Sequence, residues 1–182
     1  MKSFSVSIMA LLLLAGCYSN QQNSIDQFLV LSPARKGAAN DQRIQNFVNL
    51  YNHLEKRSVP RDTEKAYAEF LYFNDTLVTL HTRKDLIEYL ENTQKKLESL
   101  NLEVLNVFEM NGDVYVQWIM DTRFTVLGKR SDVKSLGISQ LRFDSHGKII
   151  LHQDYWDSTN GFFQHKPLLG GILQWIKTRL HS

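Results

Sequence analysis

The sequence lacks most of the features that mark cofactor, metal or nucleic-acid binding. It contains a single cysteine, Cys17, so no intramolecular disulfide can form. It has no Gly-rich phosphate loop and no nucleophile-elbow motif around a serine. The six histidines are dispersed without ligand spacing. A formal net charge of +2 gives no basic excess for nucleic acid. We therefore expect no cofactor, no metal and no nucleic-acid partner.

Long apolar runs are also missing, except for one close to the N-terminus. Lys2 precedes an apolar stretch that ends at Leu14, and the small residues Ala15 and Gly16 follow it before Cys17. A basic start, a short apolar core and small residues before a cut site are typical of a secretory signal peptide. The run is shorter than the ~20 residues that a transmembrane helix needs. Residues 1–16 are therefore predicted to be a signal peptide.

The stretch Leu14-Ala15-Gly16-Cys17 resembles the lipobox of bacterial lipoproteins. The resemblance implies that Cys17 carries diacylglycerol, that cleavage occurs before it, and that its new amine receives a fatty acid such as palmitate. Several acyl chains anchor a protein stably, whereas one binds only marginally. We expect a cell-envelope protein whose membrane contact is this lipid. Tyr18 stands where an Asp would resemble an inner-membrane signal, which favours the outer membrane, facing the periplasm, if the source is Gram-negative.

After Cys17 the chain divides into a tether and one domain of ordinary size. Residues 17–40 are rich in Ser, Asn, Gln and Ala, so we interpret them as a tether between lipid and domain. The domain, residues 41–182, has helical apolar spacing first and strand patterns afterwards, which predicts an α+β fold. Expected helices begin at Asp41 and at Asp62, the latter carrying Tyr67 and Phe70, and a third follows Thr82–Asp85.

Five strands are expected in the domain, the first of them irregular. Asn111-Gly112 and Ser145-His146-Gly147 are predicted turns between strands. The chain ends in a predicted amphipathic helix, 168–180, with Leu169, Ile172, Leu173, Ile176 and Leu180 on one face. The predicted strand ranges are 71–80, 102–109, 114–127, 135–144 and 148–157.

The order of elements resembles the nuclear transport factor 2-like superfamily, and its SnoaL-like bacterial branch in particular. Three stretches carry the resemblance: Tyr72-Phe73-Asn74-Asp75, the hairpin 141–149, and Leu151-His152-Gln153-Asp154-Tyr155-Trp156-Asp157. The resemblance implies a cone in which helices and a bent antiparallel sheet enclose one apolar pocket. Its members include ketosteroid isomerase, polyketide cyclases, dehydratases, and binding or assembly domains, so the fold alone does not choose a function.

Candidate site residues follow from strand parity and from the resemblance. His152, Asp154 and Trp156 share one strand face, and Asp75 resembles the family's base. An apolar pocket would make either Asp a usable proton acceptor. The other pocket candidates are Tyr51, Tyr67, Trp118 and Trp156. Structural alternatives remain for each set: His152 and Asp154 as sheet hydrogen-bond partners, Asp75 as a turn residue, and the aromatic residues as core.

Three functions are consistent with this pattern. The first is a membrane-anchored pocket domain that binds a small apolar ligand or an envelope partner without catalysis. The second is an isomerase, cyclase or dehydratase-like enzyme that uses Asp75 or Asp154 as its base, with His152 as orienting partner. The third is an assembly module that docks through the C-terminal helix, with a homodimer or an envelope protein as partner.

Overall fold

A computed structural model describes residues 24–32, 41–126 and 129–156. The chain divides into two units, Met1–Ala34 and Arg35–Ser182. In the first unit a helix spans 24–31, within the stretch expected to be a tether. No described helix is long and apolar enough to cross a membrane. The predicted signal peptide, Cys17, Asp157 and the predicted C-terminal helix lie outside the described residues.

The second unit opens with a capped helix, as the sequence predicts. Helix α2 spans Gln42–Tyr51, and the Asp41 side chain accepts a hydrogen bond from the backbone N–H of Arg43 at 2.9 Å. This satisfies one of the donors that a helix start leaves without a partner. A short 3-10 helix, η1 (Leu54–Lys56), follows. The buried side of α2 comprises Ile44, Phe47, Leu50 and Tyr51.

The second helix differs from the prediction. Helix α3 spans Val59–Ala66, so Asp62 lies inside its first turn and Ser58 holds the cap position. The reason is Pro60, which a helix accepts readily only in its first turn. Tyr67 and Phe70, expected on this helix, belong to strand β1 (Tyr67–Asn74). The aromatic residues of that stretch suit a pleated surface better than a helix.

Helix α4 spans Arg83–Gln94 and begins within the stretch 82–85 that was expected to precede it, with Thr82 as its cap. The Thr82 hydroxyl accepts from the backbone N–H of Asp85 at 3.2 Å and donates to the Asp85 carboxylate at 2.7 Å. This reciprocal pair stabilises the first turn. Leu86 and Leu90 are buried, as expected, but Leu97 begins strand β3 instead of ending the helix.

The six strands form one sheet in the order β2-β1-β6-β5-β4-β3. All neighbours are antiparallel except β1 and β6, which pair in parallel and were not expected to. The single irregular strand expected over 71–80 is two strands joined by a turn, in which Thr76 has φ of 73°. The remaining strands are β2 (Thr79–Thr82), β3 (Leu97–Met110), β4 (Asp113–Val126), β5 (Lys129–Phe143) and β6 (Ile149–Trp156).

Both predicted turns are confirmed. Asn111 and Gly112 have φ of 54° and 81° between β3 and β4, the left-handed values that a two-residue hairpin turn requires. Gly147 has φ of 74° in the turn before β6. Strands β3 and β5 begin at Leu97 and Lys129, several residues earlier than their patterns predicted.

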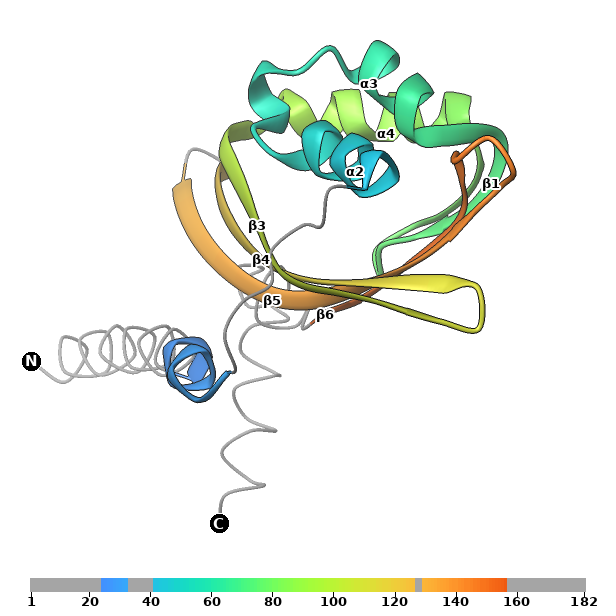
Figure 1. Cartoon of the computed structure of the whole chain (residues 1–182). Helices are drawn as coiled ribbons and strands as arrows, with labels where there is room; N and C mark the ends of the chain where they lie inside the picture. The colour runs from blue at the N-terminus through green and yellow to red at the C-terminus, as the bar shows by residue number, and fades with distance from the viewer. Residues whose placement is uncertain (1–23, 33–40, 127–128, 157–182) are drawn as a thin grey trace, which may run out of the picture. The chain divides into compact units, whose positions relative to one another are not determined.

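The helices of this unit lie on the concave side of the strongly curved sheet (Figure 1). The core lies between these two layers, and its side chains come from α2, η1, α3 and α4 on one side and from the inner sheet face on the other. The α+β class is therefore confirmed. The large side chains that are fully buried in the core include Ile44, Leu50, Leu54, Tyr67, Phe73, Leu86, Leu141 and Ile149.

Candidate functional site

The inner face of β6 carries a titratable pair in the middle of the core. His152 is 1% exposed, and the Asp154 side chain is 15% exposed. The His152 Nε2 and Asp154 Oδ1 atoms are 2.7 Å apart. A buried imidazole normally needs partners for both ring nitrogens. The neighbours of His152 therefore decide what this pair can do.

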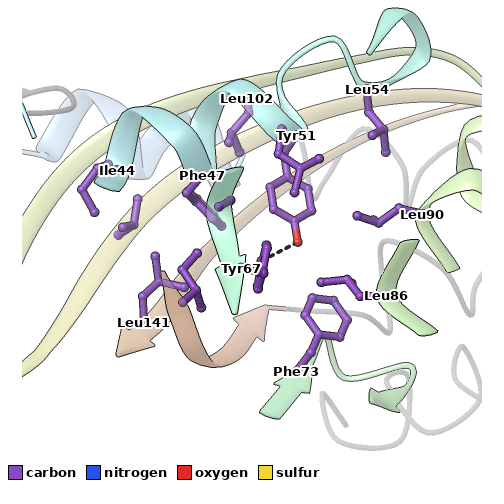
Figure 2. Close-up of a cluster of buried hydrophobic side chains, with 14 of the residues drawn as sticks. Ile44, Phe47, Tyr51, Leu54, Tyr67, Phe73, Leu86, Leu90, Leu102 and Leu141 are labelled. Carbon is purple, nitrogen blue, oxygen red and sulfur yellow. Dashed lines mark hydrogen bonds between the residues drawn. The ribbon is translucent and has the colours of Figure 1, made fainter. Parts of the chain in front are cut away.

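Two tyrosines supply the other partner of His152. The Tyr67 hydroxyl lies 2.5 Å from His152 Nδ1, and the Tyr51 hydroxyl lies 2.8 Å from that of Tyr67. Figure 2 shows these tyrosines among the apolar side chains of the core. Burial raises the pKa of both phenols well above the usual value. Both therefore remain protonated and act as hydrogen-bond donors. Tyr67 reaches the site from the start of β1 and not from a helix.

A second chain of hydrogen bonds, the second arm of the site, reaches Asp154 from the neighbouring strands β4 and β5. The Trp118 indole N–H donates to the Ser139 hydroxyl oxygen at 2.9 Å, and that hydroxyl lies 2.5 Å from Asp154 Oδ1. An indole N–H can only donate, so the Ser139 proton is left to point at the carboxylate. Two hydrogen-bond arms therefore meet at Asp154 Oδ1, one from His152 and one from Ser139.

The donor and acceptor chemistry assigns the protons along the longer arm. In the hydrogen-bond assignment that satisfies all of these groups, Asp154 Oδ1 accepts from His152 Nε2, and Nδ1 is left as an acceptor. Tyr67 then donates to Nδ1 and accepts from Tyr51. This arrangement gives each group from Tyr51 to Trp118 a hydrogen-bond partner of the opposite kind.

The second oxygen of Asp154 is different. Within the described part of the chain, Asp154 Oδ2 has no hydrogen-bond partner, whereas Oδ1 receives two. Its carboxylate is also more exposed than the buried His152 ring. Oδ2 is thus an acceptor that a bound molecule could engage.

Asp75, the position that resembles the family's base, is held in a turn. Its Oδ1 accepts from the backbone N–H groups of Leu77 and Val78 at 2.9 and 3.0 Å. Its Oδ2 accepts from the hydroxyl of Tyr89 on α4. Burial, and then the charge of Asp75, raises the pKa of Tyr89, which keeps that donor protonated. Both carboxylate oxygens of Asp75 are therefore engaged by the protein.

The two tryptophan candidates meet at one glycine. A Cβ on Gly137 would lie 2.5 Å from the Trp118 ring and 3.0 Å from the Trp156 Cβ, so only glycine fits there. The Trp156 indole N–H donates to the backbone carbonyl of Asp75 at 2.8 Å. Trp118 is buried in the core cluster and Trp156 is half-buried and packs against it, so both serve as core residues.

Apolar side chains surround this polar chain. The Phe73 ring stands perpendicular to the His152 ring, with centroids 4.9 Å apart, and Phe47 approaches it at 5.6 Å. Leucines from α4, β3 and β5 complete the surroundings (Figure 2). The described residues contain no His, Cys, Asp or Glu group arranged to hold a metal ion.

Sequence reasoning missed three residues of the site, namely Gly137, Ser139 and Tyr89. A signal for two of them existed in β5, where Ser135, Gly137 and Ser139 alternate with larger residues. Small residues at every second position mark a strand face that lies against bulky side chains. Tyr89 had no such signal, because its contact with Asp75 depends on how α4 packs.

One family model matches residues 46–152 of the chain, and its description reads uncharacterized conserved protein (DUF2358). A comparison with curated proteins gives no match.

Solved structures share the fold at low sequence identity. A candidate SnoaL-like polyketide cyclase from Shewanella denitrificans is 15% identical, with a TM-score of 0.54 over 65% of this chain and 90% of its own. A Catenulispora acidiphila protein with a ketosteroid isomerase-like fold, in complex with trimethylamine, is 12% identical, with a TM-score of 0.56 over 68% and 91%. An M. tuberculosis LEH-like epoxide hydrolase is 17% identical, with a TM-score of 0.52 over 75% and 94%.

These likenesses show that the fold is of the SnoaL-like, nuclear transport factor 2-like type. The neighbours range from polyketide cyclases to an epoxide hydrolase, so the shared fold does not select an activity.

Proposed function

Because the chain belongs to the DUF2358 family of uncharacterized conserved proteins, whose description assigns no activity, we propose its function from the geometry of its own site. The protein is a membrane-anchored pocket domain. It binds a small apolar ligand that carries one hydrogen-bond donor, and it performs no reaction on that ligand. An envelope protein that presents such a group could take the same place.

The observation that carries this proposal is the second oxygen of Asp154. It is an acceptor without a hydrogen-bond partner in the described residues, and it belongs to the carboxylate bonded to a fully paired His152 whose ring contacts Phe73. Ligand sites are mostly apolar, with a few placed polar groups that fix the ligand's orientation. An apolar body with one hydroxyl or amine group matches that combination.

The absence of catalysis is inferred from the partners of the other candidate groups. A general base must reach the proton that it abstracts. Asp75 already accepts from Tyr89 and from two backbone N–H groups. Both nitrogens of His152 are engaged, by Tyr67 and by Asp154. Both nitrogens of His152 and both carboxylate oxygens of Asp75 are therefore occupied by protein groups, which leaves neither residue well placed to take a substrate proton.

The anchor is the lipid that the lipobox predicts at Cys17. A cysteine that carries several acyl chains anchors a protein stably, because each buried CH₂ contributes ~0.8 kcal/mol. Such an anchor holds the cone at a membrane surface, where apolar molecules are concentrated. This placement supports an apolar ligand over a water-soluble one.

The proposal is tested with a matched pair of probes, 2-naphthol and naphthalene, which differ by one hydroxyl donor. We expect quenching of tryptophan fluorescence to show that the full chain binds 2-naphthol on the order of tenfold more tightly, the effect of one hydrogen bond to a charged group. Asp154→Ala should remove this preference, and Asp132→Asn, an exposed carboxyl on β5, should keep it. Equal affinities for the two probes, or no binding, would contradict the proposal.

An enzyme remains the second candidate, and the same oxygen favours it. His152 and Ser139 both bond to Oδ1 of Asp154, which leaves Oδ2 available to accept a proton from a substrate. If the cone acts on a carbonyl compound, Asp154→Asn should lower the rate at least ~100-fold. Asp75→Asn should then have little effect on the rate, because Asp75 serves the turn. Turnover by the full chain that depends on Asp154 would replace the binding proposal.

A further inference from the structure

A second apolar group lies outside the core described above. Leu105 on β3 is 0% exposed and Ile119 on β4 is 3% exposed. Neither belongs to the core cluster or to the half-buried residues that pack against that cluster. Two strand residues are therefore as deeply buried as the core without being part of it.

Strand parity places Ile119 on the outer face of the sheet. Its neighbours Trp118 and Met120 point inward to the core, so Ile119 points outward. Leu105 lies at the bulge between Val104 and Asn106, next to the same strand. On β5, Leu136 stands opposite Ile119 and Ile138 stands opposite Gln117. We call the four residues Leu105, Ile119, Leu136 and Ile138 the outer patch.

The described helices of this unit do not cover the outer patch. They lie on the concave face, as Figure 1 shows, and strand parity places the patch on the opposite, convex face. A side chain on an open sheet face stays partly wet unless another element packs on it. The burial of Leu105 and Ile119 therefore requires a cover on the convex side.

The end of β6 lies beside the outer patch. Trp156, the last residue of that strand, is paired with Gly137, which directly follows Leu136 on β5. Strands are spaced ~4.8 Å apart, so the patch begins within about 5–15 Å of the point where the chain leaves the sheet. Residues 157–167 can span roughly 35 Å. The segment that follows them can therefore reach every residue of the patch.

That segment has the complementary chemistry. Residues 168–180 carry an apolar stripe at helical spacing, made of Leu169, Ile172, Leu173, Ile176 and Leu180. Gly170 and Gly171 weaken an isolated helix there, so the segment needs a surface to stabilise it. We propose that the segment 168–180 packs this stripe on the outer patch and covers the convex face of the sheet.

The test is disulfide trapping in the full chain carrying Cys17→Ser, so that the introduced thiols are the only ones. Leu136→Cys is combined in turn with Ile172→Cys and Ile176→Cys on the stripe. The controls are Gln174→Cys, on the opposite side of the predicted helix, and Arg142→Cys in place of Leu136→Cys, near the C-terminal end of β5. We expect a stripe position to form a disulfide within one chain at least fivefold faster than either control. Equal rates would overturn the proposal, and so would disulfides only between two chains, which would assign the patch to a second copy.

A second measurement does not depend on the choice of cysteine pair. Ile119→Cys in the same background should react slowly with a thiol reagent, and deletion of 168–182 should accelerate labelling at least tenfold. Val116→Cys, in the core, reports global unfolding; if the deletion exposes that residue too, the disulfide rates decide. Unchanged protection of Ile119→Cys after the deletion would assign the cover to another segment. Binding of the deleted segment to anionic vesicles instead of to the patch would also overturn the proposal.

Discussion

The hydroxyl oxygen of Tyr67 lies 2.5 Å from Nδ1 of His152, although the two residues are 85 positions apart. Their rings are nearly parallel, at 20°. This contact joins β1 and β6, the first and last described strands in chain order, which are neighbours in the sheet and pair in parallel. It also fixes which nitrogen of His152 faces Asp154. The contact therefore links the stability of the fold to the orientation of the site.

Replacing Tyr67 with Phe tests that link. Tyr67→Phe leaves the buried Nδ1 of His152 without a donor, which should lower the free energy of unfolding by about 1–3 kcal/mol. Tyr51→Phe is the matched control, because Tyr67 keeps its bond to His152 there and the loss should be nearer ~1 kcal/mol. Urea unfolding measures both. An equal loss in the two variants would show that the bond from Tyr67 to His152 contributes no more to stability than the bond from Tyr51 to Tyr67.

A side chain at Gly137 should destabilise the fold. In Gly137→Ala the new Cβ would lie 2.5 Å from the Trp118 ring, so the ring or the strand must shift. Overpacking of this kind costs typically 1–3 kcal/mol of stability. The same change in a Trp118→Phe background should cost less, since the smaller ring leaves room, and thermal unfolding of the four proteins measures the coupling. An unchanged penalty in that background would place the strain elsewhere.

Asp113 should make the free energy of unfolding depend on pH in the acid range. The Arg142 guanidinium, bonded to both carboxylate oxygens at 2.6 and 3.1 Å, and Gln140 hold the pKa of Asp113 below its usual value. Because the folded pKa is the lower one, this stability is complete above the unfolded pKa of ~3.9. It is lost as the pH falls through the folded pKa.

Asp113→Asn should therefore reduce stability at neutral pH and make it fall less steeply below about pH 4. Unfolding in urea from pH 3 to 7 measures this. Asp132, paired with Arg123 at the surface, is the control: Asp132→Asn should have a smaller effect that disappears in high salt. Identical pH profiles for wild type and Asp113→Asn would refute the role of the Arg142 pair.

The membrane anchor is tested at its single cysteine. In cells grown with labelled palmitate, the wild-type chain should carry label and sediment with membranes. Cys17→Ser removes the only thiol that can be acylated, so the label and the membrane association should both disappear. Label or full membrane association in the variant would exclude lipidation at this position.

Local signals explain which parts of the fold the sequence predicts. The starts of α2 and α4 follow from Asp41 and Thr82, whose side chains bond to backbone groups two or three residues away. The turn at Asn111-Gly112 follows from the φ values that these residue types accept. Strand parity likewise brings His152 and Asp154 to one face, because parity needs no information from another element.

The misses concern contacts between distant segments. The end of α3 and the start of β1 at Tyr67 depend on the sheet, where β1 pairs with both β2 and β6. The partners of Asp75 include Tyr89 on α4, which no spacing rule links to it. The two alternatives for Asp75, base or turn residue, therefore could not be separated by sequence alone. In the structure, Asp75 accepts hydrogen bonds from Tyr89 and from two backbone N–H groups of its turn, which favours the turn residue.

Native mass spectrometry of the full chain tests the central claim, that the cone holds an apolar ligand at Asp154. The account predicts a retained small molecule in wild-type protein purified without detergent, its loss in Asp154→Ala, and its retention in Asp132→Asn. A chain that carries no bound molecule even after exposure to a lipid extract, or one that retains the molecule equally well in Asp154→Ala, would contradict the account.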